Sequence, residues 1–232
     1  MTDTSVVLYV RHPDKGMLEV TKGWINMARV TTDLPFELVV VEGSSAPGCW
    51  LDSDCGADQL LQYNPGKGVA AEINLGLDAC GNKYRVMVGN DVFFRPGWLE
   101  MLKEPFDLYG DCACSTLANS DSFPQQEPLN AIGEGFWGPL MMCDDRWRTD
   151  TVYEYCFIDG DILMSMYEQG FRSYRSFKQI VTHGNQMTAR VVHGHQGQAS
   201  FLERDRERFI HKHHTKGGHL WVYHALVKGW HF

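Results

Sequence analysis

The sequence predicts an α/β fold in which a mainly parallel sheet is flanked by helices. Short apolar runs rich in valine alternate with longer segments in which apolar residues recur at spacings of three and four. Runs of the first kind are typical of strands buried on both faces, and segments of the second kind are typical of amphipathic helices. Because short connections join each strand to the next helix, neighbouring strands are expected to be parallel, with right-handed crossovers.

Three strands are expected in the first 110 residues, over 5–10, 36–41 and 84–88. Each run contains no more than one Ser, Glu or Arg among its apolar residues. A strand of this composition can be covered by other elements on both of its faces. The three runs therefore predict neighbouring strands of one sheet.

Helices are expected over 17–27 and 69–80, where the apolar residues of each segment form one stripe. A shorter helix is expected over 96–102, which a proline opens, and a fourth is expected over 159–170. The segment 111–157 is rich in glycine and aromatic residues without a clear period, and it is expected to be mostly irregular.

The distribution of charge divides the chain into two parts. Residues 1–170 hold 11 Lys and Arg against 26 Asp and Glu, a formal charge of −15, whereas residues 171–232 hold 10 against 3, a charge of +7. These values sum to the −8 of the whole chain. We expect a domain over 1–200 and a basic helical extension over 201–232 that packs on it. The basic quarter predicts contact with an anion, either a small phosphate-bearing ligand or a nucleic acid.

Seven cysteines, an odd number, indicate reduced thiols rather than a disulfide framework. Cys112 and Cys114 are expected to be small buried residues on a strand. No apolar run approaches the roughly 18–20 residues of a membrane span, and residues 1–4 lead into a strand without an export signal. We therefore expect a cytoplasmic protein without a transmembrane segment.

Polar residues follow the three expected strands. Arg11 follows the first, Glu42 the second, and Asn90 and Asp91 the third. Ligands of such sheets bind beyond the carboxyl ends of the strands, so these side chains predict a nucleotide site. Asp91 could hold a divalent cation together with phosphate oxygens, or it could simply complete a turn.

Two acids stand at the start of the fourth expected helix. Asp159 and Asp161 could cap this helix and interact with its dipole, or one of them could act as a general base. Asn64 and Lys67 belong to a turn before a helix, a place suited to phosphate, although the Gly-Lys-Ser/Thr ending of a P-loop is missing. His183 could ligate a metal ion or play a structural part.

Short segments along the chain form a specific combined pattern. In chain order they are Val40-Val41-Glu42-Gly43-Ser44, Asn64-x-Gly66, Asn74-x-Gly76, Asn90-Asp91-Val92, Pro96-Gly97-Trp98-Leu99, Asp159-Gly160-Asp161-Ile162, Gly170 and His183. In this order and spacing the chain resembles the family 2 glycosyltransferases, over about residues 5–185. The resemblance implies the GT-A fold, a Rossmann-like arrangement with a mixed, mainly parallel sheet flanked by helices.

The resemblance also implies inverting transfer of a sugar from a nucleotide-sugar, with a UDP-sugar as the expected donor, to a glycan or to a modified nucleic-acid base. Asp159 matches the catalytic base. Asp91, which matches the last acid of the family's Asp-x-Asp motif, and His183 are expected to bind Mn²⁺ or Mg²⁺. Trp137 and Asp161 are expected at the acceptor site. The expected donor-binding residues are Arg11, Glu42, Asn64, Lys67, Asn74 and Asn90.

Two positions depart from the family pattern. Gly89 replaces the first acid of Asp-x-Asp, and Ile158 replaces the Glu that usually precedes the catalytic Asp. Gly89 and the basic tail also suit an alternative, a nucleotide- or nucleic-acid-binding module that has a GT-A-like core and no catalytic activity. A metal-dependent nucleotidyltransferase is disfavoured, because no Gly-rich loop with Arg or Lys follows the first strand.

Overall fold

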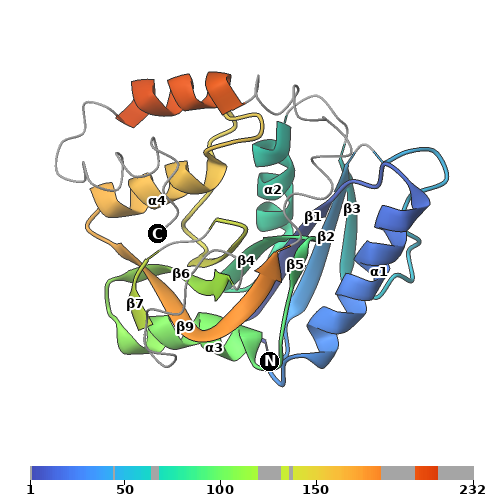
Figure 1. Ribbon diagram of the computed structural model, residues 1–232, viewed down its shortest axis with the longest axis horizontal. Coiled ribbons are helices and arrows are strands. Elements are labelled where there is room, and N and C mark those ends of the chain that lie inside the picture. The colour runs from blue at the N-terminus through green and yellow to red at the C-terminus, as the bar shows by residue number, and fades with distance from the viewer. Residues whose placement is uncertain are drawn as a thin grey trace.

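The computed structural model describes residues 2–43, 45–63, 68–119, 132–135, 138–183 and 202–213. In this described part, one sheet contains the strands in the order β3-β2-β1-β4-β8-β6-β9-β5, and β7 pairs with β9 (Figure 1). The strands are β1 Thr4–Val10, β2 Glu37–Gly43, β3 Gln59–Tyr63, β4 Tyr84–Gly89, β5 Val92–Phe93, β6 Cys112–Asn119, β7 Ile132–Glu134, β8 Leu140–Asp144 and β9 Arg172–His183.

The parallel half of the sheet is built on β1. Strands β2 and β4 pair with it in parallel, so that Leu8 lies opposite Val40 on one side and Val88 on the other. Strand β3 continues this half as a parallel neighbour of β2. The other half is mixed, since β8 is antiparallel to both β4 and β6, while β6 and β9 are parallel. The three strands expected in the first 110 residues are confirmed.

Helices cover both faces of the sheet (Figure 1). Trp24 and Trp98 pack in the core on one face, and Ile73 and Leu163 pack in the core on the other. Alternate strand residues supply each core, because successive side chains of a strand point to opposite faces. The helices are α1 Lys15–Val30, α2 Gly68–Ala79, α3 Trp98–Leu108, α4 Ile158–Glu168 and an unlabelled helix over 202–213.

The segment 111–157, expected to be mostly irregular apart from the strand of Cys112 and Cys114, contains the three strands β6, β7 and β8. Strand β6 contains small residues and β8 contains two methionines, so neither shows the β-branched pattern that identifies strands in a sequence. Cys112 and Cys114 are buried on β6, as expected, and all seven cysteines are free. None of the helices in the described ranges is long and apolar enough to cross a bilayer.

Candidate functional site

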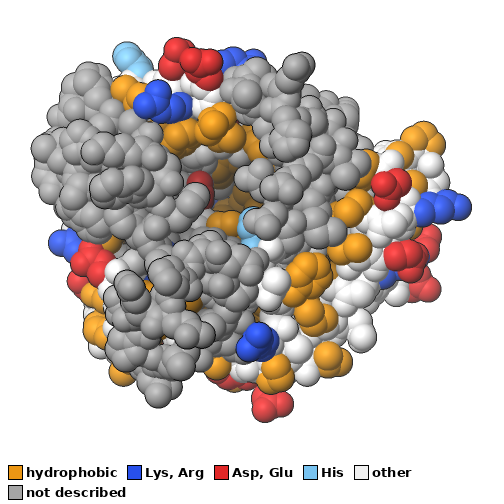
Figure 2. Space-filling view, viewed as in Figure 1, with side chains coloured by type: hydrophobic (Ala, Val, Ile, Leu, Met, Phe, Trp, Pro, Cys, Tyr) orange, Lys and Arg blue, Asp and Glu red, His pale blue; other side chains and the backbone are white. Residues whose placement is uncertain are grey.

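Distant segments of the chain meet around Tyr9, near the carboxyl end of β1. Burial raises the pKa of the Tyr9 phenol, and the negative charges of Asp91 and Asp159 raise this pKa further. Both carboxylates therefore lie within electrostatic reach of this phenol, and Gly89 lies between Asp91 and Tyr9, because a Cβ there would be 3.0 Å from Asp91 Oδ1 and 3.9 Å from the Tyr9 hydroxyl. On the face shown in Figure 2, hydrophobic side chains, an acidic side chain and a histidine are visible between the parts of the chain that are not described. We take the surroundings of Tyr9 as the candidate active site.

Arg11 follows β1, and its charge acts on Tyr155, as the charge of Asp91 does. Burial raises the pKa of Tyr155 to about 12, Cys156 and Asp91 contribute to the rise, and the positive charge of Arg11 opposes it. Tyr155 thus lies within electrostatic reach of both Asp91 and Arg11. Asp91 follows β4, which is parallel to β1, so the carboxyl ends of these two strands lie at the same edge of the sheet.

Asp91 and His183 lie side by side in this site. The imidazole Nε2 of His183 is 3.3 Å from a carboxylate oxygen of Asp91, and about 15% of each side chain is exposed. The antiparallel pairing of β5 with β9, in which Val92 lies opposite His183, creates this contact. A side chain at Gly89 would place its Cβ 3.0 Å from the other carboxylate oxygen of Asp91, so the glycine leaves that oxygen room.

The Asp91–His183 pair fits a divalent cation that takes its remaining ligands from phosphate and water. Carboxylate oxygen and imidazole nitrogen are both metal ligands, and Mg²⁺ is usually bound through one or two carboxylates plus substrate phosphates. Adjacent ligands of an octahedral ion at about 2.1 Å stand about 3.0 Å apart, close to the 3.3 Å observed here. In the described ranges no three His, Cys, Asp or Glu side chains group together as a complete metal cage.

Asp159 lies in the first turn of α4, where the helix dipole favours a negative charge. The residue before the helix, Phe157, has a φ of 59°, in the left-handed region that non-glycine residues rarely adopt. Gly138 lies directly against the carboxylate, because a Cβ at this glycine would fall 1.5 Å from the Oδ2 atom of Asp159. The position of the Asp159 carboxylate therefore depends on a glycine from a different segment.

Glu72 joins Arg11 and is a candidate that the sequence analysis missed. The Arg11 Nη2 atom donates a hydrogen bond of 3.1 Å to Oε2 of Glu72, whose side chain is 1% exposed. Burial raises the pKa of Glu72 to about 7, although the Arg11 cation opposes this rise. One feature of the sequence could have identified Glu72. It is the only acid in the first half of α2, where the other residues are mostly apolar and typical of a buried helix face.

Glu42, which is one of the expected donor-binding residues, has its partners inside the protein. Its Oε1 atom contacts His12 Nδ1 at 2.6 Å and accepts a hydrogen bond from Ser45, and its Oε2 atom accepts one from the Leu51 backbone. The residue is fully buried, and these hydrogen bonds hold the pKa of Glu42 below its usual value despite the opposing effect of burial. Both oxygens are therefore engaged inside the protein, where Glu42 joins the segments that follow β1 and β2.

The two predicted asparagines in the described ranges also bind other parts of the chain. The side-chain amide of Asn90 donates to the Thr21 hydroxyl at 2.8 Å, and Asn90 is 4% exposed. Asn74 exchanges two hydrogen bonds with the backbone of Thr149. Asn74 thereby attaches the segment around residue 149 to α2. The other predicted residues Asn64, Lys67 and Trp137 lie outside the described residues.

Asp161 is buried beneath the helix over 202–213 and is not at an open acceptor surface, which differs from the expectation. Its carboxylate accepts hydrogen bonds from the Tyr153 hydroxyl and from the Lys212 ammonium, and it lies 2.8 Å from Nε2 of His213. Asp159 and Asp161 project from the same turn into different surroundings. Because Asp161 is 2% exposed, its observed role is to attach the C-terminal helix to α4.

The basic side chains of the helix over 202–213 largely pair with acids of the body. Arg204 and Arg208 both bind Glu154, and Lys212 binds Asp150 as well as Asp161. In the same helix, the buried carboxylate of Asp205 accepts hydrogen bonds from three consecutive backbone N–H groups over 154–156. Much of the positive charge of this helix is therefore used for packing.

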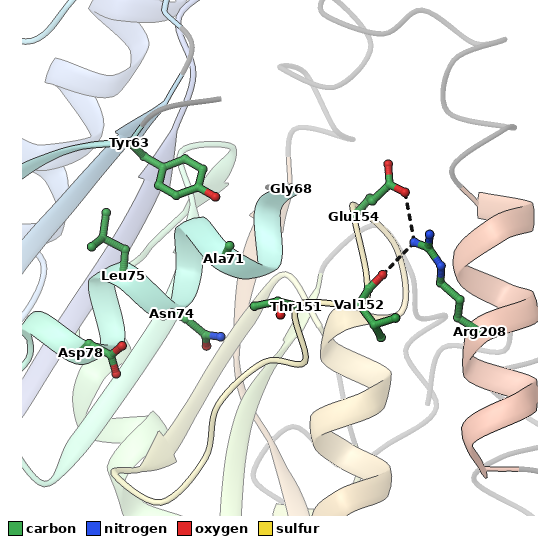
Figure 3. Close-up of a pocket in the computed structure, with 10 residues that line it drawn as sticks. All are labelled: Tyr63, Gly68, Ala71, Asn74, Leu75, Asp78, Thr151, Val152, Glu154 and Arg208. Carbon is green, nitrogen blue, oxygen red and sulfur yellow. Dashed lines mark hydrogen bonds and ion pairs between the residues drawn. The ribbon is translucent and has the colours of Figure 1, made fainter. Parts of the chain in front are cut away.

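A cleft of about 870 Å³ separates α2 from the helix over 202–213 (Figure 3). Asn74 and Leu75 line one side of it, and Glu154 and Arg208 line the opposite side. On that side, Arg208 donates hydrogen bonds to the Val152 carbonyl and to Glu154. Of the described residues predicted for the site, Asn74 alone lines this cleft, so we do not assign the chemistry to it.

No model of a known protein family matches the sequence, and no curated protein matches it significantly. Solved structures do match the fold. The mannosyltransferase PcManGT from Pyrobaculum calidifontis, in complex with GDP-Man and Mn²⁺, has a TM-score of 0.64 at 14% identity, over 90% of this chain and 64% of that one. TarS residues 1–349 from S. aureus have a TM-score of 0.59 at 11% identity, over 90% of this chain and 66% of theirs.

Glucosyl-3-phosphoglycerate synthase from Mycobacterium tuberculosis, in complex with Mg²⁺ and UDP, has a TM-score of 0.56 at 11% identity, over 88% of this chain and 79% of that one. The chain thus spans just under two thirds of the mannosyltransferase and of the TarS fragment. At such low identities the similarity establishes the fold, which is the GT-A fold expected from the sequence.

Proposed function

We propose that this protein transfers a sugar from a nucleotide-sugar to an acceptor hydroxyl, with inversion at the anomeric carbon. The observation that carries the proposal is the meeting of Asp91, His183 and Asp159 around Tyr9, at the end of the sheet where ligands of such folds bind. The GT-A fold supports it, as do the solved structures of this fold that contain GDP-Man or UDP with a divalent cation.

Asp159 acts as the general base in this proposal. Its carboxylate accepts the proton of the acceptor hydroxyl while the hydroxyl oxygen bonds to the anomeric carbon. The bond from that carbon to the donor diphosphate breaks on the opposite face, and the electron pair leaves with the diphosphate. Gly138 contributes by leaving space for the carboxylate.

Asp91 and His183 are the residues that would hold a divalent cation, Mn²⁺ or Mg²⁺. The bound cation would neutralise the negative charge that develops on the leaving diphosphate. Arg11, whose charge acts on Tyr155 as that of Asp91 does, supplies fixed positive charge near the donor. A UDP-sugar remains the donor that we expect, and Asn64 and Lys67 remain expected donor contacts.

A glycan is the acceptor class that we favour over nucleic acid. Binding of a polyanion requires unpaired Lys and Arg on an accessible surface. Arg204, Arg208 and Lys212 form ion pairs within the chain instead. The alternative of an inactive nucleic-acid-binding module gains no support from the described residues.

A nucleotide-sugar screen with Asp159→Asn tests the proposal. A bound donor stabilises the folded state, so UDP- and GDP-sugars with Mn²⁺ are screened for a rise in Tm. The variant is expected to bind the selected donor as the unchanged protein does and to lose transfer and slow hydrolysis of that donor. Full turnover in Asp159→Asn would exclude this residue as the base, and the absence of any stabilising nucleotide-sugar would exclude the proposed function.

A further inference from the structure

Helix α1 binds the residues on both sides of Asp91. The side-chain amide of Asn90 donates a hydrogen bond of 2.8 Å to the hydroxyl of Thr21. The indole Nε1 of Trp24 donates one of 2.7 Å to the backbone carbonyl of Val92. Because Thr21 and Trp24 are three residues apart in α1, both lie on the same face of the helix. One face of α1 thus holds the turn at two points, with the acid between them.

These contacts are buried, whereas the acid between them is not. Thr21, Trp24 and Asn90 are 0%, 1% and 4% exposed. Polar groups buried to this extent are costly to leave without a partner, so their hydrogen bonds resist opening. About 15% of the Asp91 side chain is exposed. The segment 90–92 is therefore fixed by its neighbours while the carboxylate stays accessible to a ligand.

A buried histidine orients the Thr21 hydroxyl. This hydroxyl directs its one hydrogen at the Met17 carbonyl, 3.2 Å away, so its oxygen acts as the acceptor in its other hydrogen bonds. Nε2 of His12 lies 2.8 Å from that oxygen and is its second donor beside Asn90. Glu42 contacts the other ring nitrogen of His12 at 2.6 Å. A chain of buried hydrogen bonds therefore runs from the end of β2 to Asn90.

The contact of Trp24 with Val92 also bears on His183. Val92 lies opposite His183 in the antiparallel pairing of β5 with β9. Strand β5 has only two residues, fewer than most strands, so its own ladder contributes few hydrogen bonds. The buried bond from Trp24 fixes this short strand from outside the sheet. It therefore supports the register that places His183 beside Asp91.

We propose that Thr21 and Trp24 are positioning residues for the divalent cation of the proposed reaction. They hold the segment 90–92 so that Asp91 and His183 can ligate one ion. Neither needs to touch the ion, because hydrogen-bonded residues behind metal ligands commonly change metal affinity by about 10- to 100-fold. The inference rests on the proposed function, in which Asp91 and His183 bind the cation. It assigns this task to one face of α1, a helix for which the sequence indicated only core packing.

Thr21→Val tests the first contact. Valine has the shape of threonine without the hydroxyl, so Asn90 and His12 lose their acceptor. We expect Mn²⁺ to bind at least about 10-fold more weakly in the presence of UDP or GDP, whichever the unchanged protein binds. The electron paramagnetic resonance of free Mn²⁺ measures this affinity. Thr21→Ser, which retains the hydroxyl, should restore most of it.

Thr31→Val is the matched control for this substitution. The Thr31 hydroxyl, at the end of α1, donates to the Met27 carbonyl at 2.7 Å, which is the same bond to the residue four positions earlier that Thr21 forms. The control should bind Mn²⁺ as the unchanged protein does. Unchanged affinity in folded Thr21→Val, no rescue by Thr21→Ser, or an equal loss in Thr31→Val would each overturn the role of Thr21.

Trp24→Phe tests the second contact and does not depend on the folding of the first variant. Phenylalanine keeps an aromatic ring in the core and removes the Nε1 donor to Val92. Because this donor fixes the strand opposite His183, the variant should lose the nitrogen coupling of bound Mn²⁺ that electron spin echo modulation detects from a histidine ligand. Trp98→Phe is the control and should keep the coupling. The buried indole of Trp98 also donates through Nε1, to the Ala28 carbonyl at 3.4 Å.

The spectrum of bound Mn²⁺ distinguishes failure of this support from failure of the metal site. Normal coupling and affinity in folded Trp24→Phe, or the same loss in Trp98→Phe, would overturn the role of Trp24. If the unchanged protein shows no nitrogen coupling, or if Asp91→Ala binds Mn²⁺ normally, the proposed metal site itself fails, and with it the proposed function.

Discussion

The Nε2 atom of His183 lies 3.3 Å from a carboxylate oxygen of Asp91, although β9 and β5 are distant in the sequence. The two-residue strand β5 is long enough to pair Val92 with His183, and this register places the histidine beside the acid that precedes β5. The family pattern expects two acids in this part of the chain. Here one of them is Gly89, so a histidine from another strand is the second candidate ligand.

Loss of either proposed ligand should weaken metal binding. We expect Asp91→Ala and His183→Ala each to weaken Mn²⁺ binding in the presence of a nucleoside diphosphate by at least about 10-fold. Substitution of residues that only hydrogen-bond to metal ligands already weakens metal binding by about this factor. Titration followed by the electron paramagnetic resonance of free Mn²⁺ measures the affinity. His211→Ala, an exposed histidine on the helix over 202–213, serves as the control. Equal Mn²⁺ affinities in all four proteins would exclude the site.

Gly138→Ala should inactivate the enzyme without removing the base. The added methyl group would lie 1.5 Å from Oδ2 of Asp159, so the carboxylate has to move. A displacement of about 1 Å can lower a rate 100-fold, and we expect kcat to fall by at least that factor while donor affinity is retained. Steady-state kinetics and calorimetry measure the two effects.

Gly23→Ala is the control for that substitution. Gly23 lies in α1, and the position that a Cβ would take there has no neighbouring atom within 4 Å, so an added methyl group meets open space. We expect unchanged kcat and a free energy of unfolding higher by up to about 1 kcal/mol, because alanine favours the helix over glycine. Normal activity of Gly138→Ala beside this control would show that Asp159 does not need the space.

The buried Glu72 should make stability depend on pH. Burial raises its pKa from 4.5 to about 7 against the opposing charge of Arg11, and Tyr9 and Tyr63 face it as neutral groups. The folded state therefore holds this proton more tightly than the unfolded state, and the contribution of Glu72 to stability falls as pH rises from about 4.5 to about 7. A shift of this size corresponds to a loss of about 3 kcal/mol.

Urea unfolding of the unchanged protein and of Glu72→Gln at pH 5 and pH 8 measures this loss. Glutamine does not titrate, so the variant lacks the contribution and the difference between the two proteins should change by up to about 3 kcal/mol between these pH values. A difference that is the same at both pH values would contradict the raised pKa.

Asp161 should stabilise the fold rather than contribute to the reaction. Asp161→Ala leaves Lys212 and the buried His213 without their shared acceptor, so we expect the free energy of unfolding to fall by about 3 kcal/mol. Hydrogen exchange should show the helix over 202–213 opening more readily, while Glu203→Ala on the exposed face of that helix should change little. Unchanged exchange in Asp161→Ala would refute the anchoring role.

Local sequence was sufficient to predict the elements with strong periodic patterns. The valine-rich runs of β1, β2 and β4 and the apolar stripes of α1 and α2 are visible in single segments, because burial on a strand or a helix imposes a period on the residues themselves. Strands β6 and β8 lack such a pattern. Their pairing partners in the sheet, rather than their own residues, decide their conformation.

The sequence by itself determined the α/β class, the strands β1, β2 and β4 with the helices α1 and α2 between them, and which acids stand at element ends, but it did not reveal β3. It could not distinguish Asp159 from Asp161, which are two residues apart. Only the tertiary structure places one of them against Gly138 and the other beneath the C-terminal helix. In the same way it engages both oxygens of Glu42, whereas Oε1 of Glu72 has no hydrogen-bond partner among the residues that the structure describes. The physical reason is that the chemistry of a carboxylate depends on neighbours from distant segments, and folding alone brings those neighbours together.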